Sequence, residues 1–230
     1  MKYTYLAIDL FTIFFPLALS FDAKLQFYKQ FKTLLQANLV VATLFITWDI
    51  LFTHLGVWGF NPKYLTGISF FNLPIEEVLF FFCVPFACMF TYACVDYYFK
   101  VKWSPRFESV FLHLFALSLL AVGLYSIPKL YTSSTFISLG IVLLVFKHLL
   151  KVDWLPKLFT TYGILLIPFF AVNGVLTGTG LEEAIVWYNN SENLGIRIGT
   201  IPIEDMFYGF ELVILNLFFV QRWRVKTTKS

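Results

Sequence analysis

Two pairs of adjacent carboxylates stand at matching positions in this chain. Glu76 and Glu77 follow Pro74, and Glu204 and Asp205 follow a second proline at the same offset (204 − 76 = 128). Each pair opens a long apolar run, where an ionised side chain is costly to keep. A carboxylic acid held neutral in such surroundings can donate a proton, and an ionised one can accept it, so acid/base chemistry is the first expectation.

The matching pattern extends upstream of both pairs. A stretch that starts at Asp49 resembles one that starts at Asn173, at an offset of 124, so the second connecting loop is four residues longer. Asp49 and Asn173 are therefore expected as supporting positions, although each fits a helix-to-helix hydrogen bond equally well. The chain is predicted to be a duplicated unit.

The composition indicates a membrane protein. Hydrophobic residues make up 59% of the chain and charged residues 13%, against roughly 45–50% and 25% in soluble domains. We therefore predict an all-α polytopic bundle of about seven transmembrane helices. The predicted spans are Tyr3–Leu19, Leu34–Phe52, Pro74–Tyr98, Val110–Ser126, Ser134–Leu149, Leu158–Leu176 and Pro202–Gln221.

The two prolines should mark the starts of the third and seventh helices. Proline suits a first helical turn, so Pro74 and Pro202 place both acid pairs beside free backbone N–H groups. These groups favour the ionised acid, whereas burial favours the protonated acid by a larger margin. The alternative is that the acids only cap the two helices or pair with Arg197.

The basic residues orient the predicted bundle. They gather in alternate connections and in the tail, so the positive-inside rule places the amino terminus outside and the carboxyl terminus in the cytoplasm of a multi-pass cell (inner) membrane protein. A cleaved signal peptide at the first segment is the alternative, but Asp9 interrupts its apolar run. The basic residues concerned are Lys24, Lys29, Lys32, Lys100, Lys102, Arg106, Lys147, Lys151, Lys157, Arg222, Arg224, Lys226 and Lys229.

The duplication is expected to be parallel. Residues 1–230 form one membrane domain, in which residues 1–105 and 134–230 are the repeat units and 106–133 a linker helix, a 3+1+3 arrangement. Both repeats then share one orientation about an axis along the membrane normal. The acid pairs lie at one depth and can face one another across that axis.

Aromatic residues make up 20% of the chain. Most should face lipid or the interface. Trp48, Trp58, Trp187 and Tyr208 lie near the depth of the acids and offer π faces to a cationic intermediate. The cysteines and histidines show no metal-ligand spacing, and no dinucleotide fingerprint occurs, so neither a metal nor a cofactor is expected.

The two Pro-x-acid-acid motifs, with Trp48-Asp49 and the Asn173 to Thr177 stretch, resemble the membrane-integral lycopene cyclase domain family. That family includes two-subunit bacterial carotenoid cyclases, their fused archaeal forms and the cyclase half of a fungal bifunctional cyclase and phytoene synthase. The resemblance covers nearly the whole chain and is closest to the fused form.

The resemblance implies cofactor-independent cyclisation of the linear ends of lycopene to β-rings, through γ-carotene to β-carotene, by an intramolecular lyase or isomerase. It places the acid/base residues at Glu76, Glu77, Glu204 and Asp205, and we expect the first acid of each pair to be essential and the second to tune protonation. The implied partners are a carotenoid substrate, the bilayer and other carotenoid enzymes, with no nucleic acid.

Two other functions fit parts of the pattern. A proton-coupled transporter also has duplicated halves with intramembrane acids, but carriers commonly break their helices at the midplane. A membrane prenyltransferase would need Asp-rich magnesium sites and basic residues for a diphosphate, and Arg197 is the one such residue near the motifs.

Overall fold

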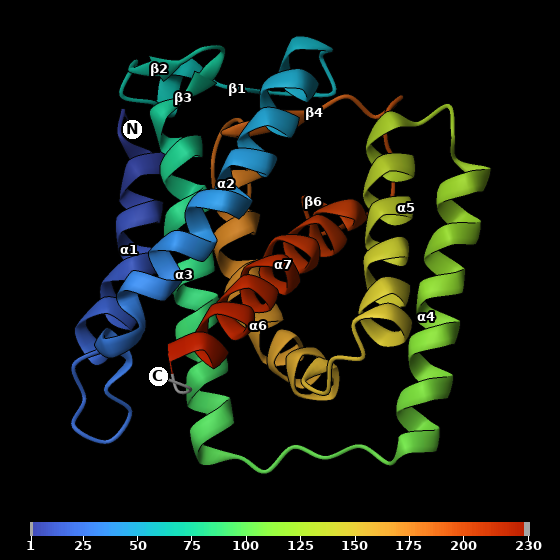
Figure 1. Ribbon diagram of the computed structural model, residues 1–230. Coiled ribbons are helices and arrows are strands. Elements are labelled where there is room, and N and C mark those ends of the chain that lie inside the picture. Colours follow the sequence, from blue (N-terminus) through green and yellow to red (C-terminus); the bar gives the residue numbers. More distant parts are fainter. Residues whose placement is uncertain (1, 228–230) are drawn as a thin grey trace.

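The computed structural model describes residues 2–227, which fold into seven α-helices. The predicted helix count is confirmed, and the predicted spans differ from the helix bounds mostly at their first turns (Figure 1). The helices are α1 (Thr4–Leu19), α2 (Phe31–His54), α3 (Ile75–Tyr98), α4 (Pro105–Tyr125), α5 (Leu130–Leu144), α6 (Leu155–Leu176) and α7 (Ile203–Thr227), with 3-10 turns η1 (Phe27–Gln30) and η2 (Pro62–Tyr64) and a π-helical turn η3 (Val145–Leu149).

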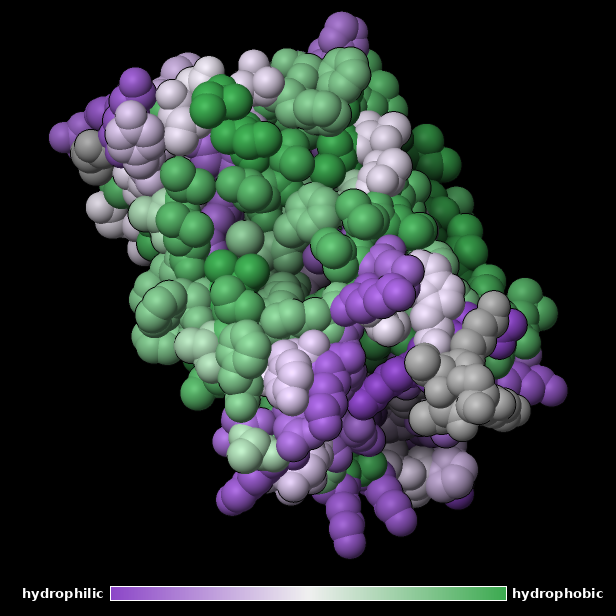
Figure 2. Space-filling view, turned by 60° about the vertical axis from the view of Figure 1, so that its left-hand side comes forward, coloured by the Kyte–Doolittle hydropathy of each residue, from purple (hydrophilic) through white to green (hydrophobic). Residues whose placement is uncertain are grey.

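The helices form a membrane bundle. Within residues 2–227, five helices, α2 to α6, are long and apolar enough to cross a membrane. α1 is a shorter apolar helix of 16 residues, and α7 carries three acids. The 24 residues of α3 extend about 36 Å, enough to cross a hydrocarbon core of about 30 Å. Figure 2 shows a broad apolar band across the middle of one face, with hydrophilic side chains gathered toward its ends.

Three two-stranded sheets, which the sequence patterns did not predict, connect the helices. β1 (Trp58–Phe60) pairs with β4 (Val186–Tyr188), β2 (Ser69–Phe70) with β3 (Leu73–Pro74), and β5 (Arg197–Ile198) with β6 (Ile201–Pro202), all antiparallel. The hairpins β2–β3 and β5–β6 lead directly into α3 and α7. They therefore fix where the two acid pairs begin.

The strand pairings follow the sequence duplication. We call α1–α3 with β1–β3 the first half and α5–α7 with β4–β6 the second half. Ser69 opposes Pro74 in one hairpin, and Arg197 opposes Pro202 in the other, again at an offset of 128. β1 and β4 are themselves equivalent strands, and the central pair of their ladder joins Gly59 to Trp187. The strand pair thus relates the halves by a local two-fold axis.

Gly59 leaves room for the Trp187 ring at this axis. A Cβ atom built there would lie 2.3 Å from Cζ2 of Trp187, so a larger residue would require the ring to move.

Helices of each half pack against helices of the other half. α1 packs along α3, and its counterpart α5 packs along α7. α2 packs on α7 of the other half, and α6 packs on α3, so each half supplies a helix to the wall of the other. The largest apolar core consequently draws on both halves, with Leu34, Phe90, Leu143, Leu158 and Ile214 among its buried members.

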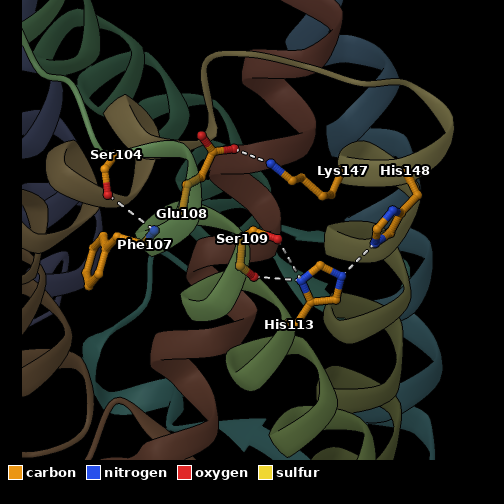
Figure 3. Close-up of polar contacts among 7 residues, drawn as sticks. All are labelled: Ser104, Phe107, Glu108, Ser109, His113, Lys147 and His148. Carbon is orange, nitrogen blue, oxygen red and sulfur yellow. Dashed lines mark hydrogen bonds and ion pairs between the residues drawn. The ribbon is translucent and has the colours of Figure 1, made fainter.

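α4 is fastened to the end of α5 by two polar contacts (Figure 3). Glu108 and Lys147 form an ion pair of 2.6 Å, and the Nε2 atoms of His113 and His148 lie 2.9 Å apart. Lys147 and His148 both belong to the π-helical turn η3. The wider turn therefore presents two consecutive residues to α4.

Candidate active site

The first acid of each pair binds the loop that precedes its own hairpin. Glu76 Oε1 accepts the backbone N–H of Thr66 (2.6 Å), and Glu204 Oε1 accepts that of Leu194 (2.7 Å). The two bonds are equivalent, since each spans ten residues and the donors are again 128 apart. Glu204 Oε1 also accepts the hydroxyl of Thr132 (2.6 Å). Both glutamates are fully buried, at 0% exposure.

The second acid of each pair accepts a tyrosine hydroxyl. Tyr5 donates to Glu77 Oε2 (2.5 Å), and Tyr131 donates to Asp205 Oδ1 (2.6 Å). Tyr5 opens α1 and Tyr131 opens α5, so the two tyrosines occupy corresponding helices. The Tyr5 contact makes α1 part of the site.

Asp205 receives two further hydrogen bonds. Asn173 donates its side-chain amide to Oδ2 (2.8 Å), and so does the hydroxyl of Tyr188 (2.9 Å). Burial and the neighbouring Asp205 carboxylate raise the pKa of Tyr188, which lies in β4, well above its usual value. Tyr188 therefore stays protonated and remains a donor. Three donors to one carboxylate favour its ionised form.

Asp49 is placed beside this group by α2. Its Oδ1 accepts the indole N–H of Trp58 in β1, while its Oδ2 has no hydrogen-bond partner among the described residues. The hydroxyl of Tyr208, one turn after Asp205 on α7, is likewise buried and unpartnered there. Both polar atoms are left available to whatever occupies the space next to them.

These residues enclose a cavity of about 80 Å³. Glu77 and Asp205 line it from opposite halves, together with Asp49 and Asn173. Its remaining wall is mainly aromatic or aliphatic: Tyr5, Trp58, Phe60, Phe80, Val84, Tyr131, Phe169, Leu176, Val186, Tyr188, Tyr208, Gly209 and Leu212. A cavity with carboxylates at its centre and aromatic faces around them can move a proton and stabilise a cation.

The structure separates the predicted site residues into two groups. Glu77, Asp205, Asp49 and Asn173 line the cavity, whereas Glu76 and Glu204 lie behind it at the loop amides. Glu77 and Asp205 retain 9% and 6% exposure, which makes them the accessible members of their pairs.

The remaining sequence-based expectations have mixed outcomes. Pro74 and Pro202 end strands β3 and β6 immediately before α3 and α7, one residue earlier than a first helical turn. Arg197 donates to Thr200 O (2.6 Å) and to Asn190 Oδ1 (2.9 Å), so the alternative in which it neutralises an acid pair is wrong.

Two of the four expected aromatic faces line the cavity, Trp58 and Tyr208. Trp48 packs behind Tyr208, and Trp187 is 47% exposed beside Gly59.

Sequence reasoning missed the three tyrosines that hydrogen-bond the acids. Tyr5 and Tyr131 are related by an offset of 126 rather than 128, and their neighbours differ in type, so the repeat does not reveal them. In the sequence repeat Phe60 is the equivalent of Tyr188, at an offset of 128, so no duplicated tyrosine marks that position. Among residues 2–227 no group of three or more His, Cys, Asp or Glu side chains is arranged to hold a metal ion.

A family model for lycopene cyclases matches this chain twice, over residues 2–95 and 128–223. The two matches together cover well over half of the chain, and each contains one acid pair with its tyrosine. The chain belongs to the lycopene cyclase family. The resemblance expected from the motifs is thereby confirmed, and membership supports carotenoid cyclisation as the activity and a carotenoid as the substrate.

In this lycopene cyclase family member, the stretch between the two matched segments contains α4. No match to the chain is found among curated proteins or among solved structures.

Proposed function

We propose that this protein is a lycopene β-cyclase, an isomerase that closes the linear ends of lycopene into β-rings without a redox cofactor or metal. The observation that carries the proposal is that two carboxylates from opposite halves, Glu77 and Asp205, line one small cavity with aromatic walls. Family membership supports the carotenoid as substrate, and the cavity supports acid/base chemistry on an apolar end group.

The reaction balances with one proton in and one proton out. A carboxylic acid donates a proton to the terminal double bond of the substrate, which leaves a tertiary cation. The next double bond attacks that cation and forms the ring-closing carbon–carbon bond. A carboxylate then removes a proton from the new ring, so substrate and product have the same composition.

The number of hydrogen-bond donors at each carboxyl suggests which of Glu77 and Asp205 donates the proton and which accepts it. Asp205 accepts from Tyr131, Asn173 and Tyr188, and this environment favours the ionised carboxylate that removes the ring proton. Among the described residues Glu77 has one side-chain donor, Tyr5, so the neutral acid is less disfavoured there. We therefore assign Glu77 as proton donor and Asp205 as proton acceptor.

The walls protect and stabilise the cation. Trp58 and Tyr208 have ring centroids 6.1 Å apart and both line the cavity, so their π faces can attract the developing charge by up to about 2 kcal/mol when desolvated. Exclusion of water by so apolar a wall would prevent capture of the cation as an alcohol.

We also infer the placement in the membrane. The connections α1–α2, α3–α4 and α5–α6 carry lysines and arginines and lie at the opposite end of the bundle from the hairpins (Figure 1). The positive-inside rule then places the hairpins and the amino terminus outside a cell (inner) membrane and the carboxyl terminus in the cytoplasm. In this arrangement α4 is the linker that gives both halves one orientation.

Expression in cells that accumulate lycopene, followed by chromatography of the pigments, tests the proposal. We expect γ-carotene and β-carotene to appear at the expense of lycopene. Rings of another type would revise the product, and unchanged lycopene beside properly inserted protein would overturn the assignment.

A further inference from the structure

A second cavity continues from the carboxylate cavity along the helices. It has a volume of about 80 Å³ and shares Phe80, Val84, Phe169, Asn173 and Gly209 with the first. Its other lining residues are Thr12, Ala87, Cys88, Tyr162, Leu165, Pro168, Val172 and Val213, from α1, α3, α6 and α7. We call this space the apolar corridor.

The polar groups of the apolar corridor are already satisfied by the protein. Thr12 donates its hydroxyl to Ile8 O (2.8 Å), and Tyr162 donates to Met206 O (2.6 Å). Asn173 gives its amide to Asp205. No charged side chain lines the corridor within the described residues. Such a wall offers a ligand neither charge nor free hydroxyl donors, so it suits a hydrocarbon.

The corridor is long and reaches the outer surface of the bundle. Its lining residues on α6 run from Tyr162 to Asn173, which lie eleven positions apart, or about 16 Å along the helix. Asn173 is buried at the carboxylate end, whereas Pro168 is exposed on a helix apolar enough to cross the membrane. A ligand can therefore extend from the carboxylates to the lipid-facing side of α6.

The two halves differ at the residue where this path begins. Gly209 stands where the two cavities meet, and its counterpart in the first half, at an offset of 128, is Phe81. Phe81 is 1% exposed and packs in a core with Phe45 and Leu212. A Cβ atom at position 209 would already lie 3.1 Å from the Tyr162 hydroxyl. The absence of a side chain at Gly209 thus leaves a passage between the two cavities, whereas the phenyl ring of Phe81 fills the equivalent position in the first half.

We propose that the apolar corridor binds the linear polyene arm of the substrate while its end group lies between Glu77 and Asp205. This inference rests on the proposed cyclase function and adds the site that positions the substrate. Because Phe81 fills the position in the first half that corresponds to Gly209, a single orientation of the arm is productive. The two ends of a symmetric carotenoid then react in separate binding events.

Narrowing the corridor from two different helices tests this. Gly209→Leu on α7 and Ala87→Leu on α3 both add bulk to it, and Gly163→Leu on α6 is the matched control, because a Cβ there meets nothing within 4 Å. Each variant is made alone for pigment conversion and in a Glu77→Gln background for the lycopene retained per purified protein. Gel filtration and thermal unfolding in detergent identify variants that fold.

We expect each folded corridor variant to lose at least about tenfold in conversion and most of its retained lycopene, while the Gly163→Leu control matches its parent. Conversion and retention at control level in a folded corridor variant would overturn the proposal. If the unsubstituted protein leaves lycopene unchanged, the cyclase assignment fails, and the retention measurement still decides whether the corridor binds the polyene.

Discussion

At the scale of single residues, the adjacent acids of each pair have different tasks. Glu77 and Asp205 line the cavity, whereas Glu76 and Glu204 hold loop amides. Sequence alone shows that both pairs matter, but it cannot rank adjacent carboxylates. The ranking depends on which side of the first helical turn faces the cavity, and from that geometry we propose the reverse of the sequence-based expectation.

Replacing the cavity acids should abolish turnover. We expect Glu77→Gln and Asp205→Asn each to reduce cyclisation by about 100-fold or more, since general acid–base groups contribute about 10²–10⁴-fold. Glu76→Gln is the matched control, because its amide oxygen can still accept the Thr66 N–H, and it should lose less than about tenfold. Initial rates with purified protein in lipid measure this, and an inactive Glu76→Gln beside an active Glu77→Gln would reverse the assignment.

The tyrosines should have graded effects. Tyr131→Phe leaves Asp205 with two donors, whereas Tyr5→Phe removes the side-chain donor seen at Glu77. A hydrogen bond to a charged group is worth about 1.5–3 kcal/mol, so we expect a loss of about tenfold or more for Tyr131→Phe, whose partner Asp205 acts as the ionised acceptor. We expect a smaller loss for Tyr5→Phe, because its partner Glu77 acts as a neutral acid, which a donor does not favour. Maximal rates of the two variants check the order, and rates equal to the unsubstituted enzyme for both would remove the tyrosines from the mechanism.

At the scale of elements, the hairpins decide where the acids lie. The seven helices could be predicted because long apolar runs bounded by proline and charge signal them directly. The strands β1 to β6 could not, because segments of two or three residues carry no readable alternation. The π-helical turn η3 could not be predicted either, since its contacts with α4, made by Lys147 and His148, join residues far apart in the sequence.

The loop bonds of the first acids predict a stability effect. Glu204→Ala leaves the Leu194 N–H and the Thr132 hydroxyl without their acceptor, at about 1–3 kcal/mol for each buried group. We expect a clearly lower melting temperature in detergent. Glu182→Ala is the control, because its ion pair with Lys63 is exposed and such pairs contribute about 0–1 kcal/mol. Equal melting temperatures for the two variants would contradict the structural role of Glu204.

At the scale of the whole molecule, the cavity belongs to neither half alone. α2 packs on α7 and α6 on α3, and Glu77 and Asp205 come from opposite halves. Sequence could predict this composite arrangement from the equal offsets and alternating loop charges. It could not predict the apolar corridor, because the exchange of Phe81 for Gly209 acquires meaning only once both cavities are located.

Splitting the chain tests the composite arrangement. Fragments that meet between α3 and α4, in residues 99–104, should be inactive alone and active when co-expressed, since helices that insert independently can reassemble in the bilayer. A break at Tyr131–Ser134, which sequence alone also allows, now falls in the first turns of α5 and should fail, because it disrupts the Tyr131 contact with Asp205. Pigment chromatography is the readout, and cyclisation by either fragment alone would contradict a shared site.

The use of two different carboxylates is tested most directly by isotope incorporation. Purified protein is equilibrated in D₂O and given lycopene, and the products are analysed by mass spectrometry. If Glu77 donates a proton and Asp205 removes another, Glu77 must be reprotonated from solvent in each cycle, so every ring should carry one deuterium with no other change in composition. Repeated turnover that yields unlabelled rings would mean that one group returns the proton it takes, and would contradict the two-carboxylate mechanism.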